Sequence, residues 1–312
     1  MSSLGGGERY LFAAADVLRS TGYAVELAAP EVPTRRALEA LGFHTTDPIR
    51  RLGKWQYIAA SARYDLAVCL TNDPPPPSLA RRSIAVVQFP MHGLSSLPPR
   101  RMAERVALRR YQCVVYSEYV LSWVKQRWAV DATVIHPPIE QGHYDAGAKR
   151  PMILSVGRFF AAQHSKRQDV LVRAFGRVAE QLGGAWRLVL AGVVAERAAD
   201  RAFLDDVRRA ADGLPVDIEI DVAPDRLAQL YTEASLYWHG AGYGRTADEP
   251  EKAEHFGMTT VEAMSYGAVP LVYDDGGQRE IVTDDVGVRW TTVDELVDAT
   301  TQLAADAGAR GQ

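Results

Sequence analysis

Short apolar runs rich in β-branched residues alternate along the chain with longer stretches of helical periodicity. This alternation is typical of parallel sheets crossed by helices, because a strand covered on both faces is apolar throughout whereas a helix buries one stripe. We therefore predict two series of strands. The first series contains AVELAAP, DLAVCL, SIAVVQF, CVVYS and ATVIHPP, and the second contains MILSVGR, WRLVLAG, VDIEI, ASLYWHG and AVPLVYD.

A polar segment rich in small residues separates the two series, at residues 140–151 (EQGHYDAGAKRP). Such a segment is typical of a linker between domains. We place the boundary at Ala148, which gives an N-terminal domain of residues 1–148 and a C-terminal domain of residues 149–312, each an α/β doubly wound sheet. Open α/β sheets bind ligands at the carboxyl ends of their strands, so we expect the site in a cleft between the two domains.

The charge balance narrows the range of partners. The chain has 312 residues, of which 39 are acidic and 35 basic. This near balance disfavours binding to a phosphate backbone, so we expect no nucleic-acid partner. The N-terminus MSSLGGGERY lacks the basic and apolar regions of a signal peptide, and we expect a cytoplasmic protein. Cys69 and Cys113 each lie in an apolar run, where a reduced thiol packs as a small hydrophobe.

The most informative segment is EHFGMTTVE at residues 254–262. An acid and a glycine precede a helix that we expect to begin near Met258. The start of a helix exposes unpaired N–H groups, and Gly257 has no Cβ to keep a diphosphate away. The carboxylates of Glu254 and Glu262 suit the hydroxyls of a sugar, so the segment predicts a nucleotide-sugar site. The alternative is that Glu254 caps the helix and Glu262 is a solvated surface residue.

A second segment, SVGRFFAAQHSKRQD, supplies positive charge. Its strand is expected to end at Gly157 and the next helix to begin near Gln168. Arg158 and Lys166 then lie on the loop at the carboxyl end of the strand, where they can neutralise a leaving diphosphate. The alternative is a solvated basic loop without a ligand.

These motifs together resemble glycosyltransferase family 4. The paired glutamates match the signature of that family, and GR…HSKRQDVLVRAF is similar to its donor-phosphate strand, loop and helix. WHGAGYG, GGQREIV and the N-terminal GGGERY fit as well. The run EHFGMTTVEAMSYGAVPLVYDDGGQREIV is similar to mannosyltransferases of asparagine-linked glycosylation and their bacterial relatives. The resemblance implies the GT-B fold, in which two Rossmann-like domains face a cleft.

The resemblance also implies roles for individual residues. Glu254 would contact the sugar hydroxyls and Glu262 the ribose, while Arg158 and Lys166 would hold the diphosphate. The remaining donor-binding candidates, which would approach the phosphate and sugar through their backbone, are Gly157, Phe256, Gly257, Met258 and Thr259.

Further candidates lie outside these two segments. Gly5, Gly6 and Gly7 match the glycine-rich loop of the family, where a missing side chain admits a sugar phosphate, and the alternative is a flexible tail. His92 is our candidate for a histidine that faces the donor sugar, with Gln88 as its rival and a purely structural histidine as the alternative. His239 either shapes the sugar pocket or is buried beside Trp238.

Two departures from the family concern the ends of the sequence. Relatives begin with a buried strand before the glycine-rich loop and end with a segment that crosses back to the N-terminal domain. Here only MSSL precedes Gly5, and the sequence ends in AADAGARGQ. We therefore expect the first strand and the C-terminal crossover segment to be missing. A sheet without its central strand leaves unpaired backbone groups, so we expect the N-terminal domain to be the weaker one.

The expected function is retaining transfer of a hexose from a nucleotide-diphosphate sugar to an acceptor hydroxyl. GDP-mannose is slightly favoured over a UDP sugar. The acceptor would be a glycan, a lipid-linked glycan or a small molecule, with peripheral membrane contact through the N-terminal domain. We expect no metal, because the acids do not cluster as a magnesium site requires, and no cofactor besides the co-substrate. The alternatives are a nucleotide-sugar 2-epimerase on the same fold and a non-catalytic relative that binds nucleotide sugars.

Overall fold

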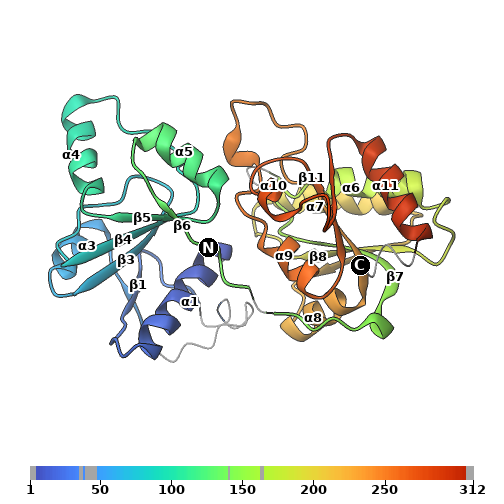
Figure 1. Cartoon of the computed structure of the whole chain (residues 1–312), viewed down its shortest axis with the longest axis horizontal. Helices are drawn as coiled ribbons and strands as arrows, with labels where there is room; N and C mark the ends of the chain where they lie inside the picture. Colours follow the sequence, from blue (N-terminus) through green and yellow to red (C-terminus); the bar gives the residue numbers. More distant parts are fainter. Residues whose placement is uncertain (1–4, 35–37, 39–47, 140, 162–164, 307–312) are drawn as a thin grey trace. The chain divides into compact units, whose positions relative to one another are not determined.

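The computed structural model describes residues 5–34, 38, 48–139, 141–161 and 165–306 (Figure 1). The chain forms two compact units, unit 1 (Met1–Pro138) and unit 2 (Ile139–Gln312), and each is described by itself. The division falls before Ala148 because the polar segment packs on unit 2. A Cβ on Gly142 would lie 2.3 Å from the Tyr266 ring, and the Gly142 N–H donates to Ser265 Oγ over 3.0 Å.

The described part of unit 2 holds a six-stranded sheet in the order β12-β11-β10-β7-β8-β9, with every pairing parallel. The strands are β7 (Arg150–Val156), β8 (Arg187–Gly192), β9 (Val216–Ile220), β10 (Ala234–His239), β11 (Val269–Tyr273) and β12 (Val288–Trp290). The chain runs outward from β7 to β9 and then returns to the other side of β7 as β10. The strand order therefore reverses between β7 and β10, which is where sheets of this type bind ligands.

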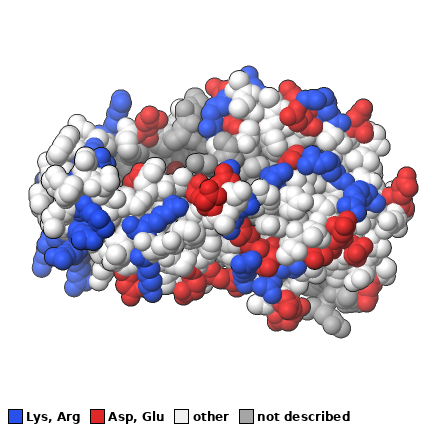
Figure 2. Space-filling model, turned by 90° about the horizontal axis from the view of Figure 1, so that it is seen from above, with Lys and Arg blue, Asp and Glu red and all other residues white. Residues whose placement is uncertain are grey.

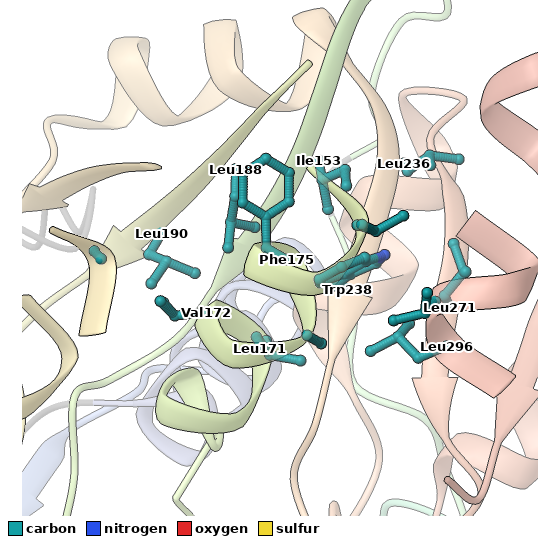
Figure 3. Close-up of a cluster of buried hydrophobic side chains, with 14 of the residues drawn as sticks. Ile153, Leu171, Val172, Phe175, Leu188, Leu190, Leu236, Trp238, Leu271 and Leu296 are labelled. Atoms are coloured by element: carbon teal, nitrogen blue, oxygen red, sulfur yellow. The ribbon is translucent and has the colours of Figure 1, made fainter. Parts of the chain in front are cut away.

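Helices cover both faces of this sheet, and alternate side chains of each strand pack on opposite faces. Figure 3 shows Phe175 of α6 with Ile153 and Trp238, in the cluster to which α7 and α11 also contribute. The other face carries Leu154 and Tyr237 against α8 and α9. The helices are α6 (Gln168–Val178), α7 (Ala198–Ala211), α8 (Pro224–Glu233), α9 (Met258–Ser265), α10 (Gln278–Ile281) and α11 (Val293–Ala305), with short 3-10 turns η1 (Ala146–Ala148) and η2 (Pro250–Lys252).

The described part of unit 1 holds a parallel sheet in the order β3-β4-β5-β6 and a separate parallel pair, β1 and β2. The strands are β1 (Leu27–Ala29), β2 (Ile49–Arg51), β3 (Leu66–Thr71), β4 (Arg82–Val87), β5 (Gln112–Val115) and β6 (Thr133–Val134). The helices are α1 (Gly6–Ser20), α3 (Lys54–Ser61), α4 (Pro98–Leu108) and α5 (Glu118–Trp128). The core lies between the sheet and α5, around Phe89, Val124 and Trp128.

The sheet of unit 1 is interrupted between β1 and β3. The Tyr64 hydroxyl, just before β3, donates to Glu26 Oε2, just before β1, over 2.5 Å. The two pieces are therefore adjacent at this end, although no ladder joins them in the described residues.

All the strand runs predicted from the sequence are strands in the structure, and α6 and α9 begin at the predicted Gln168 and Met258. Strands β2 and β12, which have three residues each, were not predicted. Each contains an arginine that interrupts the apolar pattern, whereas the equally short β1 and β6 lie within the runs that were predicted as strands.

Candidate functional site

The loop after β7 brings Lys166 back over the end of the strand. Gly157 follows β7 directly, and its N–H donates to the Ala191 carbonyl over 2.9 Å. A Cβ on Gly157 would lie 2.5 Å from Lys166 Cγ, so only glycine leaves room for the lysine stem. Arg158 is half-buried, and its guanidinium carbon lies 5.9 Å from the centre of the Phe160 ring.

Lys166 and His239 both meet one oxygen of Glu254. The Lys166 ammonium donates to Glu254 Oε2. His239 Nε2, at the end of β10, lies 3.0 Å from the same oxygen. The side chain of Glu254 is 14% exposed and that of His239 is fully buried, so little water screens these charges. The structure thus joins a cation, a carboxylate and an imidazole at the point where the strand order reverses.

The charge states of this group follow from burial and from its neighbours. Burial raises the pKa of Glu254, but the Lys166 ammonium and the His239 contact outweigh burial and hold that pKa well below its usual value. Burial lowers the pKa of His239. At neutral pH the carboxylate is therefore ionised and the imidazole neutral. Because a carboxylate can only accept, a hydrogen bond between the two groups would place the proton of the neutral ring on Nε2.

Gly257 begins α9 in a conformation that favours glycine. Its φ is +108° and its ψ is 50°, in the left-handed region. A Cβ there would also lie 2.8 Å from Gln278 Nε2. The first N–H groups of a helix have no partner within the helix, and the positive end of its dipole favours an anion. The helix cap is Gly257 itself, so Glu254 does not cap α9.

Glu262 lies inside the unit rather than on a solvated surface. Its exposed fraction is 7%, and the Tyr231 hydroxyl donates to its Oε2 over 2.9 Å. Tyr231 stacks on Tyr266 at a ring-centre distance of 5.6 Å. Thr259, also in α9, has its Oγ1 2.8 Å from the Tyr237 hydroxyl. The surface alternative for Glu262 is wrong, because α9 turns this side chain toward the tyrosine of α8.

The turn after β11 supports the backbone of Glu254, and sequence reasoning gave it no role beyond the resemblance. The Gly277 N–H donates to the Glu254 carbonyl over 2.7 Å. A Cβ on Gly276 would lie 2.2 Å from that same carbonyl oxygen. The signal in the sequence was two consecutive glycines, separated from the end of β11 by two residues, since adjacent glycines mark a close approach of two backbones.

A second feature that the sequence did not reveal ties the segment after β10 to this turn. The Arg245 guanidinium makes a two-bond ion pair with Asp275, with Nη2 to Oδ1 at 2.6 Å. Asp275 is 6% exposed. Arg167 donates to the Tyr243 carbonyl in the same segment. Nothing in the spacing of these residues along the chain predicted that they would meet.

The N-terminal candidates lie in unit 1. Gly5 is the residue before α1, and Gly6 and Gly7 form its first turn, so these residues are part of a helix start and not a flexible tail. A Cβ on Gly7 would lie 2.1 Å from Gln88 Nε2, which places the Gln88 side chain against the glycines. His92 lies on an exposed loop, with Nδ1 at 2.8 Å from Asp73 Oδ1. Its role at the donor sugar stays a prediction.

Neither a metal-binding cluster nor a membrane-spanning helix is found among the described residues. No group of three His, Cys, Asp or Glu side chains in this part of the chain is arranged to hold a metal ion. None of its helices is long and apolar enough to cross a membrane.

Comparison with curated proteins gave distant relatives. The chain is 27% identical over 203 residues to GDP-Man:Man(3)GlcNAc(2)-PP-Dol alpha-1,2-mannosyltransferase of Dictyostelium discoideum, a match that covers 59% of this chain and 37% of the relative. It is 24% identical over 183 residues to the Mus musculus enzyme of the same name, which covers 53% of this chain and 34% of the relative. The match thus spans little more than a third of the length of these relatives.

Solved structures share the fold at low sequence identity. Anabaena Alr3699/HepE in complex with UDP and glucose superposes with a TM-score of 0.67 at 16% identity, over 99% of this chain and 92% of that chain. WaaG, a glycosyltransferase involved in lipopolysaccharide biosynthesis, superposes with a TM-score of 0.65 at 14% identity, over 98% and 89%. These likenesses confirm the predicted α/β GT-B fold class with two Rossmann-like domains.

A family model described as glycosyl transferases group 1 matches residues 140–310, which include every unit 2 residue of the site described above. That match covers more than half of the chain. The protein therefore belongs to the glycosyl transferases group 1 family.

Proposed function

We propose that this protein is a retaining glycosyltransferase that moves a hexose from a nucleotide-diphosphate sugar to an acceptor hydroxyl. The observation that carries the proposal is the group around α9. Glu254, before the helix, is ionised and 14% exposed, and Lys166 lies beside it. Glu262 is buried within the helix, and Gly257 lies at the helix start. This group offers acceptors for hydroxyls and donors for phosphates in one place.

The diphosphate would bind between the start of α9 and the loop that follows β7. Lys166 has three N–H donors, so it can keep its bond to Glu254 and donate a second one to a phosphate oxygen. Arg158 would add a second cation from the same loop. The negative charge on the diphosphate grows as the glycosidic bond breaks, and fixed cations in a site with little water stabilise that change.

The sugar would bind through Glu254 and the ribose through Glu262. Lys166 and His239 both meet Oε2 of Glu254, and the described residues place no hydrogen bond on Oε1. That oxygen is therefore suited to accept from a sugar hydroxyl. The Tyr231 hydroxyl donates to Oε2 of Glu262 and so limits rotation of the carboxylate that would face the ribose.

In this mechanism the bond between the sugar C1 and the leaving phosphate oxygen breaks. The bond between C1 and the acceptor oxygen forms on the same face, and the acceptor proton passes to the leaving phosphate oxygen. No protein base is required. We propose that turnover needs no metal ion, because Arg158 and Lys166 supply the positive charge. GDP-mannose is the favoured donor, since the two curated relatives named above are GDP-mannose enzymes.

The test begins with titration of GDP, UDP and their sugars by calorimetry. Transfer from GDP-mannose to methyl α-mannoside, used as a simple hydroxyl acceptor, is then measured with EDTA present, and the anomeric configuration of the product is read by NMR. We expect an α-linked product and unchanged turnover in EDTA. An inverted product would overturn the retaining mechanism, and loss of turnover in EDTA would overturn metal independence.

The same assays separate the remaining alternatives. An isomerised nucleotide sugar formed from the donor alone would indicate a 2-epimerase. Tight binding without hydrolysis or transfer for any donor tested would indicate a non-catalytic binding protein. The natural acceptor, whether a glycan, a lipid-linked glycan or a small molecule, would follow from a screen with the donor that gives turnover. The cytoplasm remains the expected location.

A further inference from the structure

The segment that leads into β7 lies against the ends of α8 and α9 (Figure 1). This entry segment comprises residues 141–149. Near its start, a Cβ on Gly142 would lie 2.3 Å from the ring of Tyr266, the residue directly after α9. Further along, the Tyr144 ring covers Gly267, where a Cβ would lie 2.2 Å from Tyr144 Cδ2. The entry segment therefore packs tightly on the carboxyl end of α9.

Lys149, at the end of the entry segment, makes a contact that is unusual for a lysine. Figure 2 shows Lys and Arg side chains spread over one face of the molecule with Asp and Glu among them, which is the ordinary surface arrangement. Lys149 is instead half-buried, and its ammonium donates to the Ala234 carbonyl over 2.8 Å and to the Tyr231 carbonyl over 3.4 Å. These oxygens lie at the end of α8, where the last carbonyls of a helix have no partner within it. Burial lowers the pKa of Lys149 to about 8, so the charged form loses free energy at this place.

Two chains of contacts run from the entry segment to Glu262. The ring of Tyr231, whose carbonyl meets the lysine, stacks on Tyr266 at an interplanar angle of 15°, and its hydroxyl donates to Glu262 Oε2. In the second chain, the Gly142 N–H donates to Ser265 Oγ over 3.0 Å, and that hydroxyl donates to the Glu262 carbonyl over 2.7 Å. The carboxylate and the backbone of Glu262 are thus each separated from the entry segment by a single residue.

We propose that the entry segment positions the Glu262 carboxylate for the nucleotide. Lys149 acts through Tyr231, and Gly142 acts through Ser265. The role rests on the proposed function, in which Glu262 binds the ribose. A carboxylate that accepts from a ribose hydroxyl must be held in one orientation, and packed, hydrogen-bonded neighbours reduce the orientations that it can adopt. Lys149 and Gly142 do not touch the nucleotide in this arrangement, so both are positioning residues.

The alternative is that Lys149 only stabilises the end of α8. A cation near the C-terminus of a helix does stabilise it. That gain is available to a lysine in water on the last turn, whereas a half-buried ammonium also gives up hydration. The position of Lys149 therefore costs more than stabilisation of the helix requires. A fixed place for Tyr231 accounts for that cost, because the hydroxyl of this residue must reach Glu262.

The first test is calorimetric titration of GDP and of UDP into the full chain. Lys149→Met keeps the stem of the side chain and removes the ammonium. We expect it to weaken the binding of the nucleotide that the wild type binds by about threefold or more, the scale of coupling between residues in contact. Lys149→Arg keeps a cationic donor and should recover most of the loss. The matched control, Lys252→Met, removes a lysine paired with Glu249 in the same unit and should leave the Kd unchanged.

A double-mutant cycle separates positioning from stability. In Glu262→Ala the carboxylate is gone, so the addition of Lys149→Met should weaken nucleotide binding no further. The same holds for Tyr231→Phe, which lacks the hydroxyl that reaches Glu262. A role in stability alone has no reason to disappear in these two backgrounds.

Gly142 is tested against a matched glycine, Gly184. Neither has a positive φ, and a Cβ on Gly184 would meet nothing within 4 Å. Gly142→Ala pushes the entry segment and the Tyr266 ring apart, so it should weaken nucleotide binding by about threefold or more, whereas Gly184→Ala should not.

Hydrogen exchange of the entry segment gives a measurement that needs no variant. Coupling between two sites is reciprocal, so saturation of the wild type with the nucleotide should slow exchange in residues 141–149. Three results would overturn the positioning role and leave the proposed function in place: nucleotide binding that neither Lys149→Met nor Gly142→Ala weakens, an undiminished loss when Lys149→Met is added to Glu262→Ala, or exchange that the nucleotide leaves unchanged. A wild type that binds no nucleoside diphosphate would overturn the proposed function and the positioning role together. Circular dichroism of each variant confirms that it is folded.

Discussion

His239 Nε2 lies 3.0 Å from Glu254 Oε2, and the imidazole has no exposed side-chain surface. The two residues come from the end of β10 and from the segment before α9, so their contact joins a buried strand of the sheet to the proposed sugar-binding carboxylate. In the described residues neither nitrogen of this ring makes a well-aligned hydrogen bond, although Nε2 lies close to the carboxylate. Burial of a polar ring with so few partners costs folding free energy, so its retention calls for an explanation. Its close contact with the Glu254 carboxylate offers one. We infer that His239 is a positioning residue for Glu254.

Replacement of His239 should therefore separate turnover from nucleotide binding. We expect His239→Leu to lower kcat about tenfold or more, because a hydrogen bond to a charged group contributes about 1.5–3 kcal/mol. His239→Gln keeps an N–H donor near the position of Nε2 and should recover most of the loss. The affinity for the nucleoside diphosphate should stay constant in both variants. A structural role alone would lower stability and nucleotide affinity together, without rescue by glutamine.

The pH dependence of stability gives an independent measurement on the same pair. Burial lowers the pKa of His239 in the folded state, so the unfolded chain binds more protons below its ordinary pKa of about 6.5. The free energy of unfolding should then fall as the pH drops from 7 to 5, by at most about 1.4 kcal/mol per pH unit for this one group. The pKa of Glu254 is also lowered, so protonation of this residue reduces the free energy of unfolding only below about pH 4.5, its ordinary pKa. Urea unfolding of His239→Gln should show a flatter curve between pH 7 and 5, and an identical slope would contradict the assignment.

Lys166 acts on both Glu254 and the diphosphate in the proposed mechanism. Lys166→Ala should lower turnover roughly 10²-fold, the scale seen when one preorganised electrostatic donor is removed. Because burial then raises the pKa of Glu254 without a cation to oppose it, the KM for the nucleotide sugar should also become sensitive to pH near neutrality. Arg158→Ala should lower turnover without this pH effect. The control is Lys252→Ala, which removes a lysine paired with Glu249 in the same unit. Steady-state kinetics between pH 6 and 8 would show whether Lys166→Ala differs from that control.

The sequence predicted the strands and the residues at their carboxyl ends because buried parallel strands are continuous apolar runs. It could not predict that Lys166 meets Glu254, 88 residues away. The alternative that buried His239 beside Trp238 was right about burial, since the residue is 1% exposed, but wrong about its neighbour for a local reason. Neighbours along a strand point to opposite faces, so Trp238 enters the core with Phe175 while His239 shares the face of Tyr237. Pairs such as Arg245 with Asp275 depend on loop paths that no periodicity encodes.

Glu262 should control nucleotide affinity rather than the chemical step. We expect Glu262→Ala to weaken binding of the nucleoside diphosphate by about 1.5–3 kcal/mol, since a charged hydrogen bond to the ribose is lost. Tyr231→Phe removes the hydroxyl that donates to Glu262 and leaves the carboxylate in place. Its effect should be smaller and in the same direction. Calorimetric titration of the nucleoside diphosphate measures both, and an unchanged Kd for Glu262→Ala would reject the ribose contact.

Gly276 tests whether the turn after β11 holds the Glu254 backbone in place, and Gly183 provides a matched control. Both have φ in the left-handed region, +61° and +63°. A Cβ on Gly183 would meet nothing within 4 Å, whereas a Cβ on Gly276 would lie 2.2 Å from the Glu254 carbonyl oxygen. Gly183→Ala should therefore cost only the backbone strain of about 1–2 kcal/mol in unfolding free energy and leave kcat intact.

Gly276→Ala adds a clash with backbone that neither side can relieve by rotating a side chain. Glu254 must then shift, and a displacement of a catalytic group by about 1 Å can cost roughly 10²-fold in rate. We expect Gly276→Ala to lose turnover to at least that extent at a temperature where circular dichroism shows it folded. Equal kcat values for the two alanine variants would show that the position of Glu254 does not depend on this turn.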